Sequence, residues 1–361
     1  MYCAGRELYQ GADWPWFNLG TQLLFKGEDP RIDGPGGLHV FATEPRLHMG
    51  PLSLVGAAVF RTLYPGDGRI GAALFMCALG PVVIFIAERA ALRARGLRNA
   101  LDEPMIALVT LVSGGAFLFA WTEVTWAYGR LDEFMVICAA ALALWFVVNR
   151  HPLLAGATVG LSIGSKSWGV FLLPILAALP WRQALRAGLV AAVVGAAAWL
   201  PFVLADAAGT IDSLRATEAV RVAPGSGAHA LGVDLGLVPD WLRPVQAAVA
   251  LTLAALAVVR GRWAAALLLA VGARLALDPG VIAYYTAALV FAALVWDLFG
   301  RRRPLPIWAL GTLIAFFSVP ELTADSDSRG LARVGIVLAA VVVVLAAPKA
   351  WLHRARPAEA A

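Results

Sequence analysis

An aspartate, Asp13, begins a short aromatic segment ahead of a long apolar sequence. It precedes Trp14, Trp16 and Phe17, and Gly20 follows at helical spacing. A carboxylate held over an apolar, aromatic surface could accept a proton from a hydroxyl nucleophile. The alternative is an exposed aspartate that caps a short amphipathic helix, and the spacing alone favours this second interpretation.

An arginine and two acidic residues occur together in Gly129-Arg130-Leu131-Asp132-Glu133, where a loop enters an apolar stretch. Such a group could orient a polar headgroup at the membrane surface. The alternative is a helix N-terminus whose acids complement the helix dipole, and by itself the pattern supports this at least as well.

A lysine, Lys166, interrupts an apolar stretch in Gly164-Ser165-Lys166-Ser167-Trp168. A lysine between two short apolar segments is expensive at membrane depth unless it meets an anion or a carboxylate. The alternative is a lysine whose long stem lets its ammonium reach the membrane surface. The central position of Lys166 favours a functional role.

A second basic residue near a membrane surface, Arg274, is followed by Asp278-Pro279-Gly280 and then by Tyr284 and Tyr285. This group could hold a phosphate through charge-assisted hydrogen bonds. An Arg274–Asp278 ion pair beside an aromatic belt explains the same residues equally well.

These groups belong to a strongly apolar chain. Of its 361 residues, 60% are hydrophobic and 15% are charged, with a mean hydropathy of +0.75. Soluble domains carry about a quarter charged residues, so the composition indicates a polytopic membrane protein. Only three cysteines are present, and two lie in apolar runs, so neither a disulfide framework nor a metal cluster is indicated.

The hydropathy pattern predicts an all-α bundle of about 11 transmembrane spans. The apolar run at 51–60 is too short to cross a membrane and is interpreted as a helix on the bundle surface. The short pair on either side of Ser165–Ser167 has the pattern of a discontinuous helix. The predicted spans are 69–90, 104–122, 131–149, 152–164, 167–180, 187–205, 244–260, 263–277, 280–299, 304–320 and 331–348.

Charges in alternate loops predict the orientation. One set holds 15 basic and 5 acidic residues, a net charge of +10, whereas the rest of the chain holds 14 basic and 19 acidic residues, a net charge of −5. Short loops rich in arginine face the cytoplasm, so this set is assigned to the inside. The set comprises 88–103, 150–151, 181–186, 260–262, 297–303 and the tail from 349.

Three regions follow from this orientation. Residues 1–68 form an external N-terminal region with the juxtamembrane helix, residues 69–348 form the bundle, and 349–361 form a cytoplasmic basic tail. The segment 206–243, which lacks a long apolar run, is expected to be one external loop. An external segment ahead of the first span normally follows a signal-anchor helix, so we expect an additional transmembrane helix upstream of Met1.

With these motifs the chain resembles the GT-C superfamily of integral-membrane glycosyltransferases, and within it the actinobacterial polyprenyl-phosphate-mannose mannosyltransferases of glycosyltransferase family 87. Two parts of the N-terminal region contribute: Asp13 with Phe17 and Gly20, and Pro45 to Pro51 leading into the surface helix. The other matching segments are Gly129 to Asp132, Gly160 to Trp168 ahead of Leu172-Leu173-Pro174, and Arg274 to Tyr285.

The resemblance implies an inverting transfer of a sugar from a lipid-phosphate donor on the external face. The acid of the first external loop would be the general base, here Asp13. Basic residues hold the donor phosphate, here Lys166 and Arg274 with Tyr284 or Tyr285 as partners, where a cation offsets the charge on the leaving phosphate. Further site candidates are His48, Arg130, Asp132 and Asp278. No metal and no cofactor besides the lipid-linked donor is expected.

The sequence therefore predicts a multi-pass cell-membrane mannosyltransferase that acts on an envelope glycolipid or glycan. Its partners are membrane lipids, the polyprenyl-phosphate sugar and the acceptor, and the basic pI near 9.4 is attributed to membrane orientation and not to nucleic acid. A transporter or flippase for a lipid-linked or amphipathic solute is the main alternative, because a broken helix at Lys166 would suit it. A non-catalytic membrane protein whose external region binds a partner is a third possibility.

Overall fold

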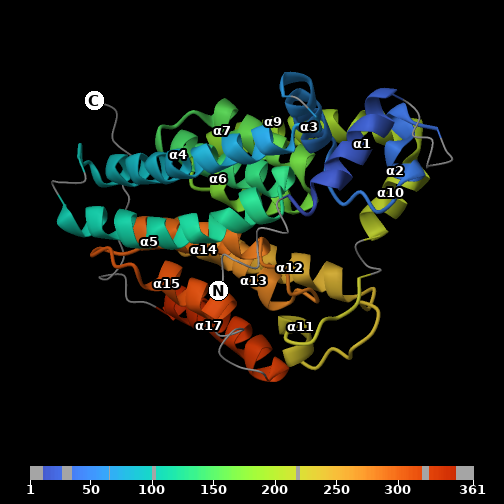
Figure 1. Cartoon of the computed structure of the whole chain (residues 1–361). Coiled ribbons are helices and arrows are strands. Elements are labelled where there is room, and N and C mark those ends of the chain that lie inside the picture. The colour runs from blue at the N-terminus through green and yellow to red at the C-terminus, as the bar shows by residue number, and fades with distance from the viewer. Residues whose placement is uncertain are drawn as a thin grey trace.

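The structure is a computed structural model that describes residues 11–26, 35–64, 66–99, 103–216, 220–318 and 325–346. The elements in these ranges are helices that run mostly along one direction of an elongated bundle (Figure 1). They are α1 (Trp14–Lys26), η2 (Gly37–His39), α2 (Val40–Thr43), α3 (Pro51–Leu63), α4 (Arg69–Arg95), α5 (Pro104–Thr122), η4 (Glu123–Ala127), α6 (Leu131–Val148), α7 (Pro152–Ser165), η5 (Ser167–Leu172), α8 (Leu173–Leu176), α9 (Trp181–Ala205), α10 (Ala207–Arg215), α11 (Gly227–Ala230), α12 (Leu242–Val259), η7 (Trp263–Ala265), α13 (Ala266–Ala276), α14 (Tyr285–Phe299), α15 (Ile307–Leu313), η8 (Ile314–Ser318) and α17 (Ser326–Ala346).

The predicted all-α, polytopic bundle is confirmed. Among the described residues, six helices are long and apolar enough to cross a membrane: α4, α5 with η4, α6, α9, α12 and α17. The other five predicted spans coincide with shorter apolar helices or helix pairs, and the predicted surface helix coincides with α3.

Two of the short helices, α13 and α14, form the centre of the bundle. Every residue of α13 is buried, and so is every residue of α14 after its first. A helix that is apolar on all sides is stable only when other helices surround it. The C-terminal turn of α13 and the N-terminus of α14 are therefore held rigidly, and they carry Arg274 and Tyr285.

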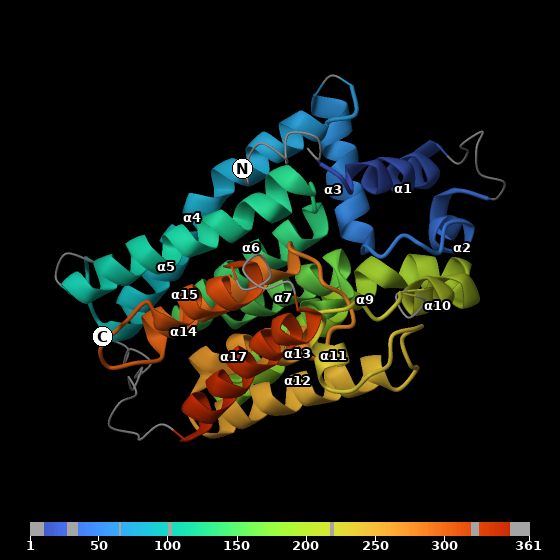
Figure 2. The same ribbon diagram turned by 60° about the horizontal axis from the view of Figure 1, so that its bottom comes forward.

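Within the described residues, the loops of the basic set lie at one end of the bundle and those of the other set lie at the opposite end (Figure 2). At one end, Arg95 donates to the carbonyl of Leu298 at 2.6 Å and to that of Arg301 at 2.7 Å. Arg260 donates to the carbonyl of Leu345 at 2.8 Å. We call this the Arg-rich end, and the opposite end, where α1 and α10 lie, the site end.

The N-terminal region is more regular than the predicted external loop, because α1, α2 and α3 fold against the bundle. The backbone N–H groups of Gly11, Ala12 and Asp13 donate to the carbonyls of Trp126, Ala127 and Tyr128 at 2.9–3.1 Å. The segment 206–243 likewise contains α10 and α11. The first ten residues and the predicted tail at 349–361 lie outside the described residues.

A row of glycines lets α7 pack closely against α9. A Cβ atom added at Gly156 would lie 2.2 Å from the carbonyl oxygen of Ala187, and one at Gly160 would lie 2.8 Å from that of Ala191. Small residues four apart allow such close approach of membrane helices. The contact fixes the position of the C-terminal end of α7, where Ser165 precedes Lys166.

We expect Gly156→Ala to lower the stability of the protein by about 1–3 kcal/mol, because the added methyl group forces α7 away from the backbone of α9. The matched control is Gly188→Ala on α9, where an added Cβ has no atom within 4 Å. Thermal unfolding of both detergent-purified variants tests this. Equal unfolding midpoints for the two would contradict the packing described here.

Candidate functional site

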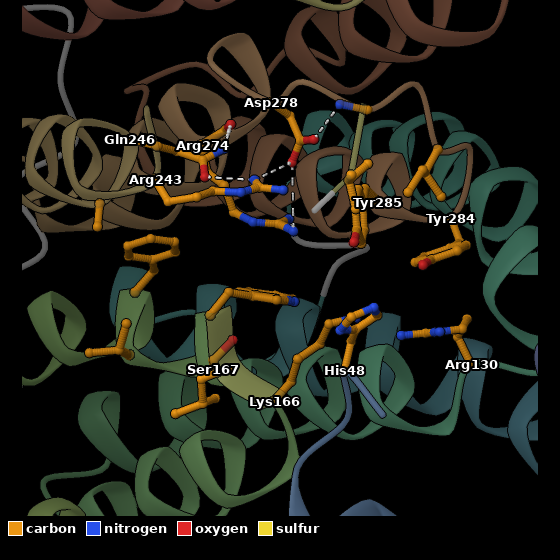
Figure 3. Close-up of a pocket in the computed structure, with 18 residues that line it drawn as sticks. His48, Arg130, Lys166, Ser167, Arg243, Gln246, Arg274, Asp278, Tyr284 and Tyr285 are labelled. Atoms are coloured by element: carbon orange, nitrogen blue, oxygen red, sulfur yellow. Dashed lines mark hydrogen bonds and ion pairs between the residues drawn. The ribbon is translucent and has the colours of Figure 1, made fainter. Parts of the chain in front are cut away.

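A cavity of about 360 Å³ opens between the helices at the site end. Two walls face one another across it (Figure 3). The first wall carries His48, Arg130, Lys166 and Ser167, and the second carries the residues Arg243, Gln246, Arg274, Asp278, Tyr284 and Tyr285. Cationic groups and phenol rings thus converge on one space from segments far apart in the sequence.

A break between two helices positions Lys166 in the first wall. Helix α7 ends at Ser165, Lys166 has an extended backbone, and the 3₁₀ segment η5 continues from Ser167. The N–H of Gly50, ahead of α3, donates to the carbonyl of Ser165 at 2.8 Å. This contact satisfies a carbonyl at the helix end, where no intrahelical partner is available. The discontinuous helix predicted from the sequence is therefore present.

Arg130 joins two carboxylates in the first wall. Its Nε and Nη2 donate to the two oxygens of Asp132 at 3.0 and 2.7 Å, and its Nη1 lies 3.2 Å from Oδ2 of Asp13. Asp132 is fully buried, whereas the Asp13 side chain is 24% exposed. A bidentate arginine–carboxylate pair has fixed geometry, so Asp132 holds the guanidinium that in turn holds Asp13.

Lys166 is enclosed by acceptors on the same wall. Its Nζ lies 2.6 Å from Oε1 of Glu133 and 2.9 Å from Oδ2 of Asp132. The indole N–H of Trp168 donates to the other oxygen of Glu133 at 3.0 Å. The lysine therefore meets carboxylates, one of the two partners that its position in an apolar stretch predicted.

The two tyrosines cover the cations from the second wall. The Tyr284 ring centroid is 4.8 Å from the Arg130 guanidinium carbon, and the Tyr285 centroid is 5.2 Å from Nζ of Lys166. The Arg274 guanidinium lies 4.3 Å from the Tyr285 centroid. Cation–π attraction of this kind keeps buried cations in place without neutralising their charge.

Arg243 and Arg274 face a single carboxylate in the second wall. Oδ2 of Asp278 lies 3.6 Å from Nη1 of Arg243 and 3.9 Å from Nη2 of Arg274. The other oxygen of Asp278 accepts the N–H of Gly280 at 2.8 Å and so shapes the turn that leads toward Tyr284. Arg243 lies in the first turn of α12, and its Nη1 donates to Oε1 of Gln246 at 3.0 Å.

His48 enters the first wall on a loop that is clamped on both sides. Ser213 of α10 donates to the carbonyl of Leu47 at 3.2 Å, and Gly50 is bound to Ser165. Partial burial in the cavity, together with the charges of Arg130, Lys166 and Arg243, lowers the pKa of His48 to about 4, against a smaller opposing effect of Asp132. The imidazole is therefore neutral at physiological pH and can accept or donate a hydrogen bond.

This low pKa predicts a pH dependence of stability. Between about pH 6.5 and pH 4 the unfolded chain protonates His48 while the folded protein does not, so stability falls as pH falls through this range. We expect His48→Gln to lose less stability between pH 7 and pH 4.5 than the wild type. Unfolding midpoints at both pH values measure the difference, since carboxylates titrate equally in the two proteins. An equal loss in both proteins would contradict the prediction.

Most of the residues that sequence reasoning selected meet at this cavity. His48, Arg130, Lys166, Arg274, Asp278, Tyr284 and Tyr285 line it, while Asp13 and Asp132 lie behind Arg130. The structural features named as alternatives are present as well, because Asp132 and Glu133 lie in the first turn of α6 and Arg274 lies 3.9 Å from Asp278. Their chemical roles stay predictions.

Sequence reasoning missed Arg243 and Gln246. One signal was available for Arg243, because a basic residue in the first turn of a helix opposes the helix dipole and needs another reason to be there. Glu133 was considered in the sequence only as part of a headgroup-orienting group or of a helix start, whereas it is a fully buried partner of Lys166. In the described part of the chain, no group of three or more His, Cys, Asp or Glu side chains is arranged to hold a metal ion.

No protein-family model matches the chain, and no curated protein matches it in sequence. Among solved structures, it is similar to the crystal structure of ArnT from Cupriavidus metallidurans bound to undecaprenyl phosphate, with a TM-score of 0.46 and 16% sequence identity. The similarity covers 93% of this chain and 72% of that chain. Such a level of similarity assigns no function to the residues of the cavity.

Proposed function

We propose that the protein is a membrane glycosyltransferase that transfers mannose from a polyprenyl-phosphate donor to an envelope glycolipid or glycan. The observation that carries this proposal is the convergence of Arg130, Lys166, Arg243 and Arg274 on one cavity at the end of an apolar helical bundle. Four cationic side chains at the end of an apolar bundle are suited to bind the phosphate of a lipid. The choice of mannose rests on the sequence resemblance.

The chemistry follows from where charge develops. As an acceptor hydroxyl attacks the anomeric carbon, the bond from that carbon to the phosphate oxygen breaks and its electrons pass to the departing lipid phosphate. The cations of the cavity stabilise the charge that grows on this phosphate. Because they are already fixed by carboxylates and tyrosine rings, no reorganisation is needed at the moment of reaction.

In this proposal Asp13 takes the proton of the acceptor. Its carboxylate is partly exposed beside Arg130, which also lines the cavity, so it stands at the edge of the donor site and not inside it. An acceptor hydroxyl that approaches from this edge meets Asp13 on one side and the donor on the other. Loss of that proton to Asp13 makes the oxygen a better nucleophile.

The charge distribution supports an extracytoplasmic site. The Arg-rich end carries the short basic loops, which by the positive-inside rule face the cytoplasm. The cavity lies at the other end. A donor and an acceptor embedded in the outer leaflet would therefore reach it directly.

The test is transfer from labelled polyprenyl-phosphate mannose in membranes that overexpress the protein, with polyprenyl-phosphate glucose as a second donor. The proposal expects label from the mannose donor to appear in a new glycolipid or glycan. A transporter would instead move intact, labelled donor between leaflets. Intact donor with no new product would overturn the proposed function.

A further inference from the structure

The two walls of the cavity differ in how their cations are neutralised. On the first wall, Arg130 and Lys166 meet Asp132 and Glu133 at 2.6–3.0 Å, and Asp13 adds a third carboxylate at 3.2 Å. Every oxygen of Asp132 and Glu133 is in use. The positive charge of this wall is compensated within the protein.

The second wall has an excess of positive charge. Arg243 and Arg274 share only Asp278, and the separations of 3.6 and 3.9 Å are longer than a hydrogen bond. Arg333 of α17 also interacts electrostatically with Asp278. The carboxylate of Glu133 also interacts electrostatically with Arg274 from across the cavity. Both oxygens of Glu133 already accept hydrogen bonds, one from Lys166 and one from Trp168.

Two donors of this wall have no hydrogen-bond acceptor among the described residues. They are Nε of Arg243 and Nη1 of Arg274, and both atoms are buried. Arg274 as a whole is 7% exposed and lines the cavity. A buried guanidinium N–H without an acceptor is destabilising, and an anionic oxygen in the cavity would remove this penalty.

Apolar side chains line the cavity on both walls. Val170 and Phe171 belong to η5, which begins at Ser167 of the first wall, and Ala247 and Ile282 line the cavity near the arginines of the second wall. A free phosphate would leave these side chains against water, whereas a phosphate that carries a hydrocarbon chain covers them. The combination of excess charge and apolar lining suits the headgroup of a lipid.

We propose that Arg243 and Arg274 form the subsite for the phosphate of a lipid, and that Asp278 attenuates the affinity of this subsite. Arg243 is thus a ligand-binding residue in addition to those predicted from the sequence. Lys166 contributes less to binding of the anion, because two carboxylates already neutralise it. That the bound lipid is the sugar donor rests on the proposed function, whereas the subsite itself does not.

Equilibrium binding of radiolabelled undecaprenyl phosphate to the purified full chain tests the subsite. We expect Arg243→Gln and Arg274→Gln to weaken binding by about 10- to 100-fold, the effect of losing charged hydrogen bonds. Asp278→Asn should instead tighten binding by about tenfold, because it removes the opposing charge. Asparagine can still accept the N–H of Gly280, so the turn is retained.

The matched control is Arg46→Gln, because Arg46 is a 69% exposed side chain that pairs with Glu44 outside the cavity. Binding in this control should equal that of the wild type. Weaker binding in Asp278→Asn, or unchanged binding in Arg243→Gln, would overturn the subsite. Displacement of the lipid by inorganic phosphate at equal concentration would overturn its assignment to a lipid. Absence of sugar transfer with this binding pattern intact would refute the proposed function and leave the subsite standing.

Discussion

Replacing Asp13 by asparagine is expected to lower the rate of sugar transfer by about 10²- to 10⁴-fold, the usual contribution of a general base. Asparagine cannot accept the proton of the acceptor hydroxyl. The substitution spares the fold, because Arg130 keeps its two hydrogen bonds to Asp132. Transfer measured alongside donor binding checks this, since binding should change little.

Asp234→Asn is the control for Asp13→Asn. It removes an exposed carboxylate from the segment 206–243 and leaves the cavity lining untouched. Transfer in this variant should match that of the wild type. Wild-type turnover in Asp13→Asn would remove Asp13 from the role of base, and a large loss of donor binding would make it a binding residue instead.

Replacing Asp132 by asparagine is expected to have the largest effect on stability, a loss of about 3–5 kcal/mol. Asp132 is fully buried and bound to both Arg130 and Lys166, so its loss leaves these two cations, which are only 7% and 4% exposed, with one carboxylate fewer. Breaking one side of a buried ion pair is costly because the partner cannot regain its hydration. Unfolding of the detergent-purified variant measures the loss.

An exposed pair provides the comparison for Asp132→Asn. On α10, Nη1 of Arg215 lies 3.9 Å from Oδ1 of Asp212. The side chains of Asp212 and Arg215 are 65% and 69% exposed. Exposed pairs contribute about 0–1 kcal/mol, so Asp212→Asn should leave the unfolding midpoint almost unchanged. Equal unfolding midpoints for Asp132→Asn and Asp212→Asn would show that the ion pairs of Asp132 with Arg130 and Lys166 do not stabilise the fold.

The membrane helices could be predicted from the sequence because each is recognised from the hydropathy of its own residues alone. Helix α6 was expected at 131–149 and is found at Leu131–Val148, and the break at Ser165–Ser167 was expected from the polar residues themselves. The division of the loops between the two ends could also be predicted from the sequence, because it depends only on the charges in the loops between spans.

Pairings between distant residues could not be predicted in the same way. The contacts of Arg130 with Asp13 and of Lys166 with Glu133 join positions that are 117 and 33 residues apart. They depend on how α6, α7 and the N-terminal region pack, and hydropathy carries no information on that packing. For the same reason Arg243 was recognised only once α12 was seen beside Asp278. The helix α10 was missed within the segment 206–243, because it is too short to give a membrane signal.

Sugar transfer is tested most directly with purified wild-type protein in proteoliposomes, with labelled polyprenyl-phosphate mannose as donor and an envelope lipid extract as acceptor. A mannosyltransferase is expected to yield a new labelled product together with an equimolar amount of released polyprenyl phosphate. Recovery of all label as unchanged donor, in either leaflet, would contradict this expectation.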